Sequence, residues 1–401
     1  MSELSYLEKL LDGVKVEWLP LGEITKYEQP TKYLVKAKDY HDTYTIPVLT
    51  AGKTFILGYT NETHGIYQAS KAPVIIFDDF TTANKWVDFD FKAKSSAMKM
   101  VTSCDDNKTL LKYVYYWLNT LPSEFAEGDH KRQWISNYSQ KKIPIPCPDN
   151  PEKSLAIQSE IVRILDKFTA LTAELTAELN MRKKQYNYYR DQLLSFKEGE
   201  VEWKALGEIG EVRMCKRILK SQTSSEGEIP FYKIGTFGKE PDSYISRKLF
   251  NEFKEKYSYP KVGEVLISAS GTIGRTVIFD GRESYFQDSN IVWIENNEKI
   301  VLNKYLFYFY KIAKWGISEG GTIKRLYNDN LRKLTIPVPF PDSPERSLVE
   351  QQKIVKLLDK FDALTNSITE GLPREIELRQ KQYEYYRDLL FSFPKPDTVS
   401  N

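Results

Sequence analysis

Two short stretches of this chain contain residue types that could bind a metal ion or a phosphate. Asp242, Glu252 and Lys254 follow the order PD…ExK, which is typical of metal-dependent nucleases. The pattern is short, arises readily by chance and has no counterpart in the other half of the chain. Residues 51–54, AGKT, resemble the end of a phosphate-binding loop, but the place of that loop's first glycine is taken by Pro47. A nuclease and a nucleotide-binding loop are therefore alternatives that the sequence does not favour.

Other catalytic and metal-binding motifs are absent from the sequence. Neither the glycine-rich loop nor the [DN]PP[YF] motif of methyltransferases that modify amino groups in DNA occurs, and there is no G-x-S-x-G elbow. The histidines lack metal-ligand spacing, and the cysteines stand far apart without a CxxC pair. These residues are His41, His64, His130, Cys104, Cys147 and Cys215. The sequence predicts no catalytic residue and no metal site.

Basic, amide and hydroxyl side chains in loop-like stretches suit nucleic acid better than catalysis. Arg and Lys can bind phosphates or read guanine, and Gln can read adenine. Lys131-Arg132 and Lys324-Arg325 are the best candidates, because both pairs occupy the same position of an internal repeat. For each residue, a solvated surface charge is the simpler alternative. The candidate DNA-binding residues are Lys53, Thr54, Lys85, Trp86, Lys131, Arg132, Gln133, Lys216, Arg217, Ser270, Thr272, Arg275, Lys324 and Arg325.

The composition is that of a globular protein. Hydrophobic residues make up 41% of the 401 residues and charged residues 28%. The net charge of +2 does not indicate a nucleic-acid binder, although a large chain can concentrate charge on one face. No apolar run is long enough to span a membrane, and the N-terminal MSELSYLEKLLDG has no apolar signal core. We therefore expect a cytoplasmic protein without a membrane partner.

The chain contains much of its own sequence twice, and the longest shared stretch recurs at an offset of 193 residues. Residues 143–168 match residues 336–361 at sixteen of 26 positions, and VEWLPLGEI (16–24) recurs as VEWKALGEI (201–209). The phrase QYNYYRDQLLSF (185–196) returns as QYEYYRDLLFSF (382–393). Variable segments separate these shared segments, and SYLEKLL near the N-terminus resembles YYRDQLL (188–194). This order predicts a pseudo-two-fold, nearly circular arrangement with the termini close together.

The shared segments are expected to form long helices that pack as an antiparallel coiled coil. From Ile161 to Leu193, apolar residues advance by alternating threes and fours, interrupted only by Arg182. The prolines before each helix predict that it begins at Ser154 or Ser347, and Gly371-Leu-Pro373 predicts a break in the second copy. Within the first helix the tetrapeptide TAEL is written twice (172–179), with Thr172, Leu175, Thr176 and Leu179 as candidate spacer residues.

In these repeated segments and helices, the chain resembles the specificity subunits of type I restriction–modification systems. The resemblance covers the whole chain and rests on the duplicated VEWxxLGEI, on VLISASGTIGR (265–275), on GGTIKRLYNDNLRKLTIPVP (320–339) and on the paired QYxYYRDxLxSF. The tandem TAEL resembles the enterobacterial subgroup with repeats in the central helix. The resemblance implies a non-catalytic subunit that reads a split site in double-stranded DNA. It further implies two modification subunits and two restriction subunits as partners, whose complex uses S-adenosylmethionine, ATP and Mg.

The predicted fold is α+β, with two mixed target recognition domains separated by two long antiparallel helices. We expect an N-terminal helix and first recognition domain at 1–142 and a first helical spacer at 143–199. A second recognition domain follows at 200–335, and a second spacer with the C-terminal tail at 336–401. A nuclease that uses Asp242, Glu252 and Lys254, or a coiled-coil scaffold without a DNA role, is the alternative function.

Overall fold

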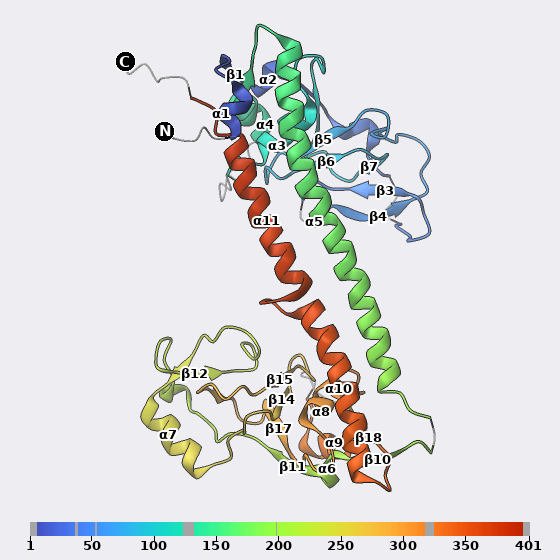
Figure 1. Ribbon diagram of the computed structural model, residues 1–401, viewed down its shortest axis with the longest axis vertical. Coiled ribbons are helices and arrows are strands. Elements are labelled where there is room, and N and C mark those ends of the chain that lie inside the picture. Colours follow the sequence, from blue (N-terminus) through green and yellow to red (C-terminus); the bar gives the residue numbers. More distant parts are fainter. Residues whose placement is uncertain are drawn as a thin grey trace. The chain divides into compact units, whose positions relative to one another are not determined.

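The computed structural model describes residues 6–36, 39–52, 54–122, 132–197, 199–316 and 325–395. The chain divides into two compact units (Figure 1). Unit 1 contains Met1–Thr176 and Glu375–Asn401, and unit 2 contains Ala177–Arg374. Each unit combines helices with antiparallel and mixed sheets, which confirms the predicted α+β fold with two domains. The four-segment division of the chain stays a prediction, because each compact unit also includes part of the long helices.

Unit 1 consists of three small sheets and their covering helices. Strands β2-β8-β5-β6 form an antiparallel sheet, and β4-β3-β7 form a second sheet in which β3 and β7 are parallel. Strands β1 and β9, which are far apart in the sequence, form an antiparallel pair. Strands β3 and β4 are joined as a β-hairpin. The elements are α1 (Tyr6–Leu11), β1 (Val16–Pro20), α2 (Leu21–Ile24), β2 (Thr25–Glu28), η1 (Pro30–Tyr33), β3 (Ile46–Leu49), β4 (Ile56–Thr60), β5 (Val74–Asp78), β6 (Asn84–Val87), β7 (Lys92–Ala93), β8 (Met98–Ser103), α3 (Leu111–Leu118), α4 (Gln133–Ser136), η2 (Tyr138–Gln140) and β9 (Lys142–Pro146).

Unit 2 repeats this topology strand for strand. Its sheets are β11-β17-β14-β15, β13-β12-β16 and β10-β18, and β12 pairs in parallel with β16 as β3 does with β7. The elements are β10 (Val201–Ala205), α6 (Leu206–Ile209), β11 (Gly210–Arg213), η3 (Lys220–Gln222), β12 (Ile229–Tyr232), β13 (Tyr244–Ile245), α7 (Arg247–Lys256), β14 (Val265–Ser268), β15 (Thr276–Ile278), β16 (Tyr285–Phe286), β17 (Ile291–Asn296), α8 (Asn303–Tyr310), α9 (Asn328–Lys333) and β18 (Thr335–Pro339).

The central strand of each unit is apolar on both faces because both faces are covered. In β5, Ile75 and Phe77 pack with α3, while Val74 and Ile76 pack toward the β4-β3-β7 sheet. Strand β14 divides its side chains in the same way between two cores. A continuous run of β-branched and aromatic residues is the pattern expected of a strand buried on both sides.

Three long helices follow the two small-sheet regions. They are α5 (Pro151–Leu193), α10 (Pro344–Asn366) and α11 (Gly371–Leu390), so the predicted break falls between Asn366 and Gly371. The prediction that the helices begin at Ser154 and Ser347 is wrong. Proline is tolerated at the first helical position, where no intrahelical N–H bond is lost. Asn150 accepts a hydrogen bond from the Lys153 N–H (3.0 Å), which satisfies one of the free groups at the start of α5.

The helices pack through the repeated aromatic residues. In unit 1, Phe168 of α5 stacks on Tyr386 of α11, with ring centres 5.2 Å apart. In unit 2, Tyr189 of α5 stacks on Phe361 of α10 at 5.6 Å. In both units the early part of one copy therefore meets the late part of the other, as an antiparallel pairing requires.

The two ends of the described chain meet inside unit 1. Leu7 and Leu11 of α1 share a core with Leu390 and Phe391 at the end of α11. The Trp18 indole N–H donates to the Pro394 carbonyl at 2.8 Å. These contacts confirm the prediction that the termini lie close together.

Candidate nucleic-acid interface

Arg132 and Arg325 occupy equivalent positions in the two units. The residue after each arginine donates its backbone N–H to the residue that follows the central strand: Gln133 to the Asp79 carbonyl at 2.9 Å, and Leu326 to the Ala269 carbonyl at 2.8 Å. The repeat-based prediction that these arginines correspond is thereby confirmed. Three other predicted DNA-binding residues lie outside the described residues: Lys53, Lys131 and Lys324.

Unit 2 contains a basic cavity of about 490 Å³ beside Arg325. Four cationic side chains reach its walls together with amide and hydroxyl groups. These residues are Arg217, Lys220, Lys233 and Arg325, with Thr223, Ser243, Gln287, Ser289 and Asn290, and the lining also includes one carboxylate, Asp288. Such a surface offers positive charge for phosphates and amide groups for base edges.

Hydrogen bonds hold the cavity's polar groups in defined positions. The Arg325 guanidinium donates to the Ser289 carbonyl (3.2 Å), and the Ser270 hydroxyl donates to the Asn290 side-chain oxygen (2.8 Å). Arg217 forms an ion pair with Asp288 at 2.9 Å, while its side chain is 68% exposed. The structure thus brings two predicted residues, Arg217 and Arg325, to one cavity, and a third, Ser270, bonds to Asn290 of its lining. Lys220, Lys233 and Gln287 were missed, because only the fold brings 220–223, 233 and 287–290 together.

The other predicted DNA-binding residues of unit 2 make contacts within the protein that are sufficient to explain their positions. The Arg275 guanidinium donates to the Phe237 carbonyl at 3.0 Å, and the Thr272 carbonyl accepts from the Ser268 hydroxyl at 2.5 Å. The Lys216 ammonium lies over the Tyr257 ring, 5.1 Å from its centre. Thr272 and Lys216 are nevertheless exposed, so their predicted DNA contacts stay predictions.

The candidates of unit 1 divide into exposed and packed residues. Thr54, Lys85 and Arg132 are exposed, whereas Gln133 is buried in α4. Trp86 is partly buried and its ring packs on Tyr115, with ring centres 6.0 Å apart. Packing in the core is therefore sufficient to explain Trp86 and Gln133.

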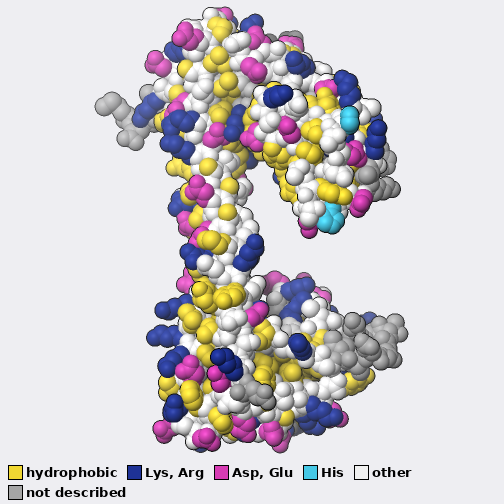
Figure 2. All heavy atoms as spheres, turned by 90° about the vertical axis from the view of Figure 1, so that its right-hand side faces the viewer, with side chains coloured by type: hydrophobic (Ala, Val, Ile, Leu, Met, Phe, Trp, Pro, Cys, Tyr) yellow, Lys and Arg dark blue, Asp and Glu magenta, His cyan; other side chains and the backbone are white. Residues whose placement is uncertain are grey.

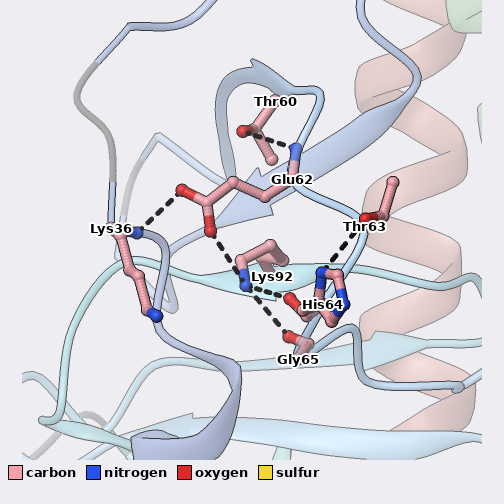
Figure 3. A network of polar contacts seen from close by, with 7 residues as sticks. All are labelled: Lys36, Thr60, Glu62, Thr63, His64, Gly65 and Lys92. Atoms are coloured by element: carbon pink, nitrogen blue, oxygen red, sulfur yellow. Dashed lines mark hydrogen bonds and ion pairs between the residues drawn. The ribbon is translucent and has the colours of Figure 1, made fainter.

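A buried lysine fixes an exposed loop of unit 1 that the sequence did not single out (Figure 3). The Lys92 ammonium donates to the carbonyl groups of His64 (2.6 Å) and Gly65 (3.2 Å) and forms an ion pair with Glu62 at 3.1 Å. The Lys92 side chain is only 3% exposed. Glu62 also accepts from the Lys36 backbone N–H at 2.9 Å. No sequence signal marks Lys92, because a single lysine in a strand normally reaches solvent.

Each small-sheet region is attached to its long helix by the same buried amide. Gln158 of α5 accepts from the Leu110 N–H (2.9 Å) and donates to the Lys108 carbonyl (3.0 Å). Gln351 of α10 accepts from Leu302 and donates to Ile300, both at 2.9 Å. Both glutamines are fully buried.

A tyrosine–aspartate hydrogen bond adds to each attachment. Tyr116 donates to Asp166 at 2.5 Å, and Tyr308 donates to Asp359 at 2.6 Å. Burial, followed by the bond to the carboxylate, raises the pKa of Tyr116 and of Tyr308 far above the ordinary tyrosine value. Both phenols therefore stay protonated and remain hydrogen-bond donors.

The repeated tetrapeptide is regular helix. Leu175 and Leu179 are partly buried, whereas Thr176 is exposed. The Thr172 hydroxyl donates to the Phe168 carbonyl (2.9 Å) and the Thr176 hydroxyl to the Thr172 carbonyl (2.7 Å). Each unit of the repeat thus satisfies its hydroxyl one turn earlier in the same helix.

The exposed tyrosines of the repeated phrase are also duplicated. Tyr188 is 61% exposed and Tyr385 65%. Each packs edge-on against the following tyrosine, Tyr189 or Tyr386, at 5.4 and 5.3 Å between ring centres. Two equivalent aromatic patches are therefore available to partners.

The residues of the nuclease pattern do not gather at one site. Asp242 pairs with Lys233 at 2.8 Å and Glu252 with Lys256 at 3.1 Å, while the Lys254 ammonium lies over the Tyr259 ring. Among the described residues, no group of three His, Cys, Asp or Glu side chains could hold a metal ion. Likewise, no described helix combines the length and apolarity needed to cross a membrane. On the face drawn in Figure 2, basic and acidic side chains are interspersed.

Comparison with known proteins identifies the family. The model of the type I restriction modification DNA specificity domain matches residues 14–182 and again residues 198–378. The chain is 67% identical to the type I restriction enzyme EcoR124I/EcoR124II specificity subunit of Escherichia coli, with 100% of each chain covered. It is 35% identical to the EcoprrI specificity subunit of Escherichia coli, covering 92% of this chain and 93% of that one. A crystal structure of a type I S subunit from M. genitalium has the same fold, with a TM-score of 0.58 at 15% identity over 96% of this chain and 98% of that one.

The duplicated units and these matches define a DNA-recognition subunit of a restriction–modification system. The chain belongs to the family of type I restriction–modification DNA specificity subunits, which are non-catalytic.

Proposed function

We propose that each unit reads one half of a bipartite site in double-stranded DNA. The observation that carries the proposal is the pair Arg132 and Arg325, held by equivalent backbone hydrogen bonds in units whose surrounding loops differ. Two domains that recognise different half-sites need the same backbone fold but different residues in the loops that contact DNA. The basic cavity around Arg325, with Arg217, Lys220 and Lys233, is the proposed contact surface of unit 2.

The partners follow from the family and from the duplicated patches. Two modification subunits dock on the long helices, one at Tyr188 and one at Tyr385, and two restriction subunits complete the complex in the cytoplasm. The partners, and not this chain, bind S-adenosylmethionine, ATP and Mg. The similar exposure of the two tyrosines supports two copies of the same partner.

Single-residue substitutions test the reading of half-sites. Arg132→Ala and Arg325→Ala should each weaken recognition of one half-site, by about 1–3 kcal/mol if a base contact is lost. Methylation by the reconstituted complex is measured on DNA with substitutions in one half-site at a time. Unchanged discrimination in both variants would place these arginines outside the interface.

The repeated tetrapeptide is proposed to set the spacer between the half-sites. One TAEL tetrapeptide adds ~6 Å of helix and ~400° of rotation. Leu175 and Leu179 therefore point within ~40° of the same direction, and an added tetrapeptide would keep its leucine near that direction as well. A step of ~6 Å lies between one and two base-pair steps of ~3.4 Å. The alternative is a filler of good helix propensity, which explains the composition but not the tandem repetition.

An insertion tests the spacer role. A third TAEL after Leu179 should lengthen the preferred spacer, by one base pair, and leave both half-sites unchanged. Methylation is measured on substrates that differ only in spacer length, with Thr176→Ala as a control of unchanged length. If the optimum stays the same with three units, the filler interpretation stands.

A further inference from the structure

The turn between β5 and β6 contains an exposed aromatic residue. Phe80 is 49% exposed, although unit 1 has well-packed apolar cores on both faces of the adjoining sheet. It follows Asp79, whose carbonyl accepts the N–H of the residue after Arg132. The backbone of Phe80 therefore adjoins the hydrogen bond that holds the segment of the proposed DNA-binding Arg132.

The backbone of this turn is rigid. The Asp78 carboxylate accepts the N–H groups of both Phe80 and Thr81 at 2.9 Å. The Asp78 backbone donates to Ala83 (2.8 Å) and accepts from Thr82 (2.9 Å). Thr82 has a φ of 58°, which a β-branched residue adopts only when its surroundings enforce it. The backbone that carries Phe80 is thus held by several hydrogen bonds within the turn.

The buried Asp79 carboxylate joins the turn both to β8 and to the segment of Arg132. The Asp79 carboxylate and the Lys99 ammonium are 2.9 Å apart, and both side chains are fully buried. The other carboxylate oxygen of Asp79 accepts the Trp134 N–H at 2.9 Å. A buried ion pair contributes little to stability on balance, so a role in holding two segments in register explains it better.

Unit 2 carries different chemistry at the same position. Ser270 follows Ala269 there, as Phe80 follows Asp79, but it is 9% exposed and donates to Asn290 at 2.8 Å. The shared frame therefore offers an apolar ring in one unit and a hydroxyl in the other. This is the kind of difference by which two units could read different bases.

We propose that Phe80 is a specificity-determining residue of unit 1, and that its ring contacts the C5-methyl group of a thymine in the major groove. Phenylalanine is among the side chains that make this contact. The inference rests on the proposed function, because it requires that the Arg132 region meets DNA.

Replacement of thymine by deoxyuridine removes only the methyl group and tests the contact directly. Each thymine of both half-sites is replaced in turn, and binding and methylation by the assembled complex are measured. The wild type should lose about fourfold in affinity at one position of one half-site, the factor expected for one apolar methyl group. Phe80→Ala should bind thymine and deoxyuridine equally at that position, and Phe80→Leu should retain part of the preference. Leu57→Ala, which shortens another exposed apolar side chain of unit 1, should retain all of it.

Several results would overturn the inference. One is a preference for thymine that survives in Phe80→Ala, and another is a half-site of unit 1 that contains no thymine on either strand. A third is that Phe80→Ala, compared with the wild type, loses the same factor of affinity for thymine DNA as for deoxyuridine DNA. That result would show that Phe80 contacts DNA without reading the methyl group. If Arg132→Ala still weakens one half-site in any of these cases, the proposed function stands without Phe80. If the wild-type complex shows no sequence preference, the proposed function itself fails.

Discussion

Replacing Gln158 by leucine should destabilise the attachment of the unit 1 sheets to α5. Leucine has a similar volume but neither accepts nor donates a hydrogen bond, so the part-buried Leu110 N–H and Lys108 carbonyl lose their partners. An unsatisfied buried group costs about 1–3 kcal/mol, and part-buried groups fall at the lower end, so the two together give about 2 kcal/mol. We expect the free energy of unfolding of unit 1 to fall by about that amount.

The loss is measured by urea unfolding followed by circular dichroism, and locally by hydrogen exchange at the Leu110 amide. Gln351→Leu breaks the equivalent bonds of unit 2 and should destabilise that unit to a similar extent. Because the two glutamines belong to different compact units, their effects should add. Gln192→Leu, at an exposed position of α5, is the control and should change stability by less than ~0.5 kcal/mol. A loss below ~0.5 kcal/mol for Gln158→Leu, with unchanged exchange at Leu110, would refute the reasoning.

Three further predictions concern charge, ionisation and backbone conformation. Lys220→Ala should weaken binding to all DNA sequences alike and reduce the slope of log affinity against log salt by about 0.9, as for one lost phosphate contact; an unchanged slope would place Lys220 away from DNA. Burial raises the pKa of Tyr383 to about 12, so the neutral phenol favours the folded state, and stability should fall as the pH rises from about 10 to 12. Alkaline urea titrations should show a shallower fall in Tyr383→Phe, and equal slopes would contradict this. Gly371→Ala should lower the free energy of unfolding by about 1–3 kcal/mol, because Gly371 has a φ of 75° and an added Cβ would lie 2.4 Å from the Ala363 carbonyl oxygen. Gly235→Ala, where a Cβ meets nothing within 4 Å, is its control, and an equal loss in both variants would argue against backbone strain.

The repeats predicted much of the fold, because the same residues recur wherever the two units need the same contact. The correspondence of Arg132 with Arg325 and the break before Gly371 could be read from the sequence for this reason. The start of the helices could not be predicted in this way. A proline can either precede a helix or occupy its first position, and the residue type alone does not distinguish the two.

The candidate site was harder to predict than the fold. Gln133 and Trp86 have residue types that suit DNA, yet the fold buries or packs them. Arg217 pairs with Asp288, which is 71 residues away, and the cavity brings 217–223 to 287–290, which follow the strand β16 that pairs with β12. Contacts of this kind depend on tertiary packing, which one sequence without its fold does not reveal.

The most direct test of the central claim is a methylation map after exchange of one unit's variable segment. Residues 25–142 are replaced by the same region of the Escherichia coli relative that is 35% identical. The methylated adenines are then mapped in DNA from cells that carry the assembled complex. We predict that one half of the methylated site changes while the other half stays as in the parent. A map in which both halves change, or neither does, would contradict the reading of one half-site by each unit.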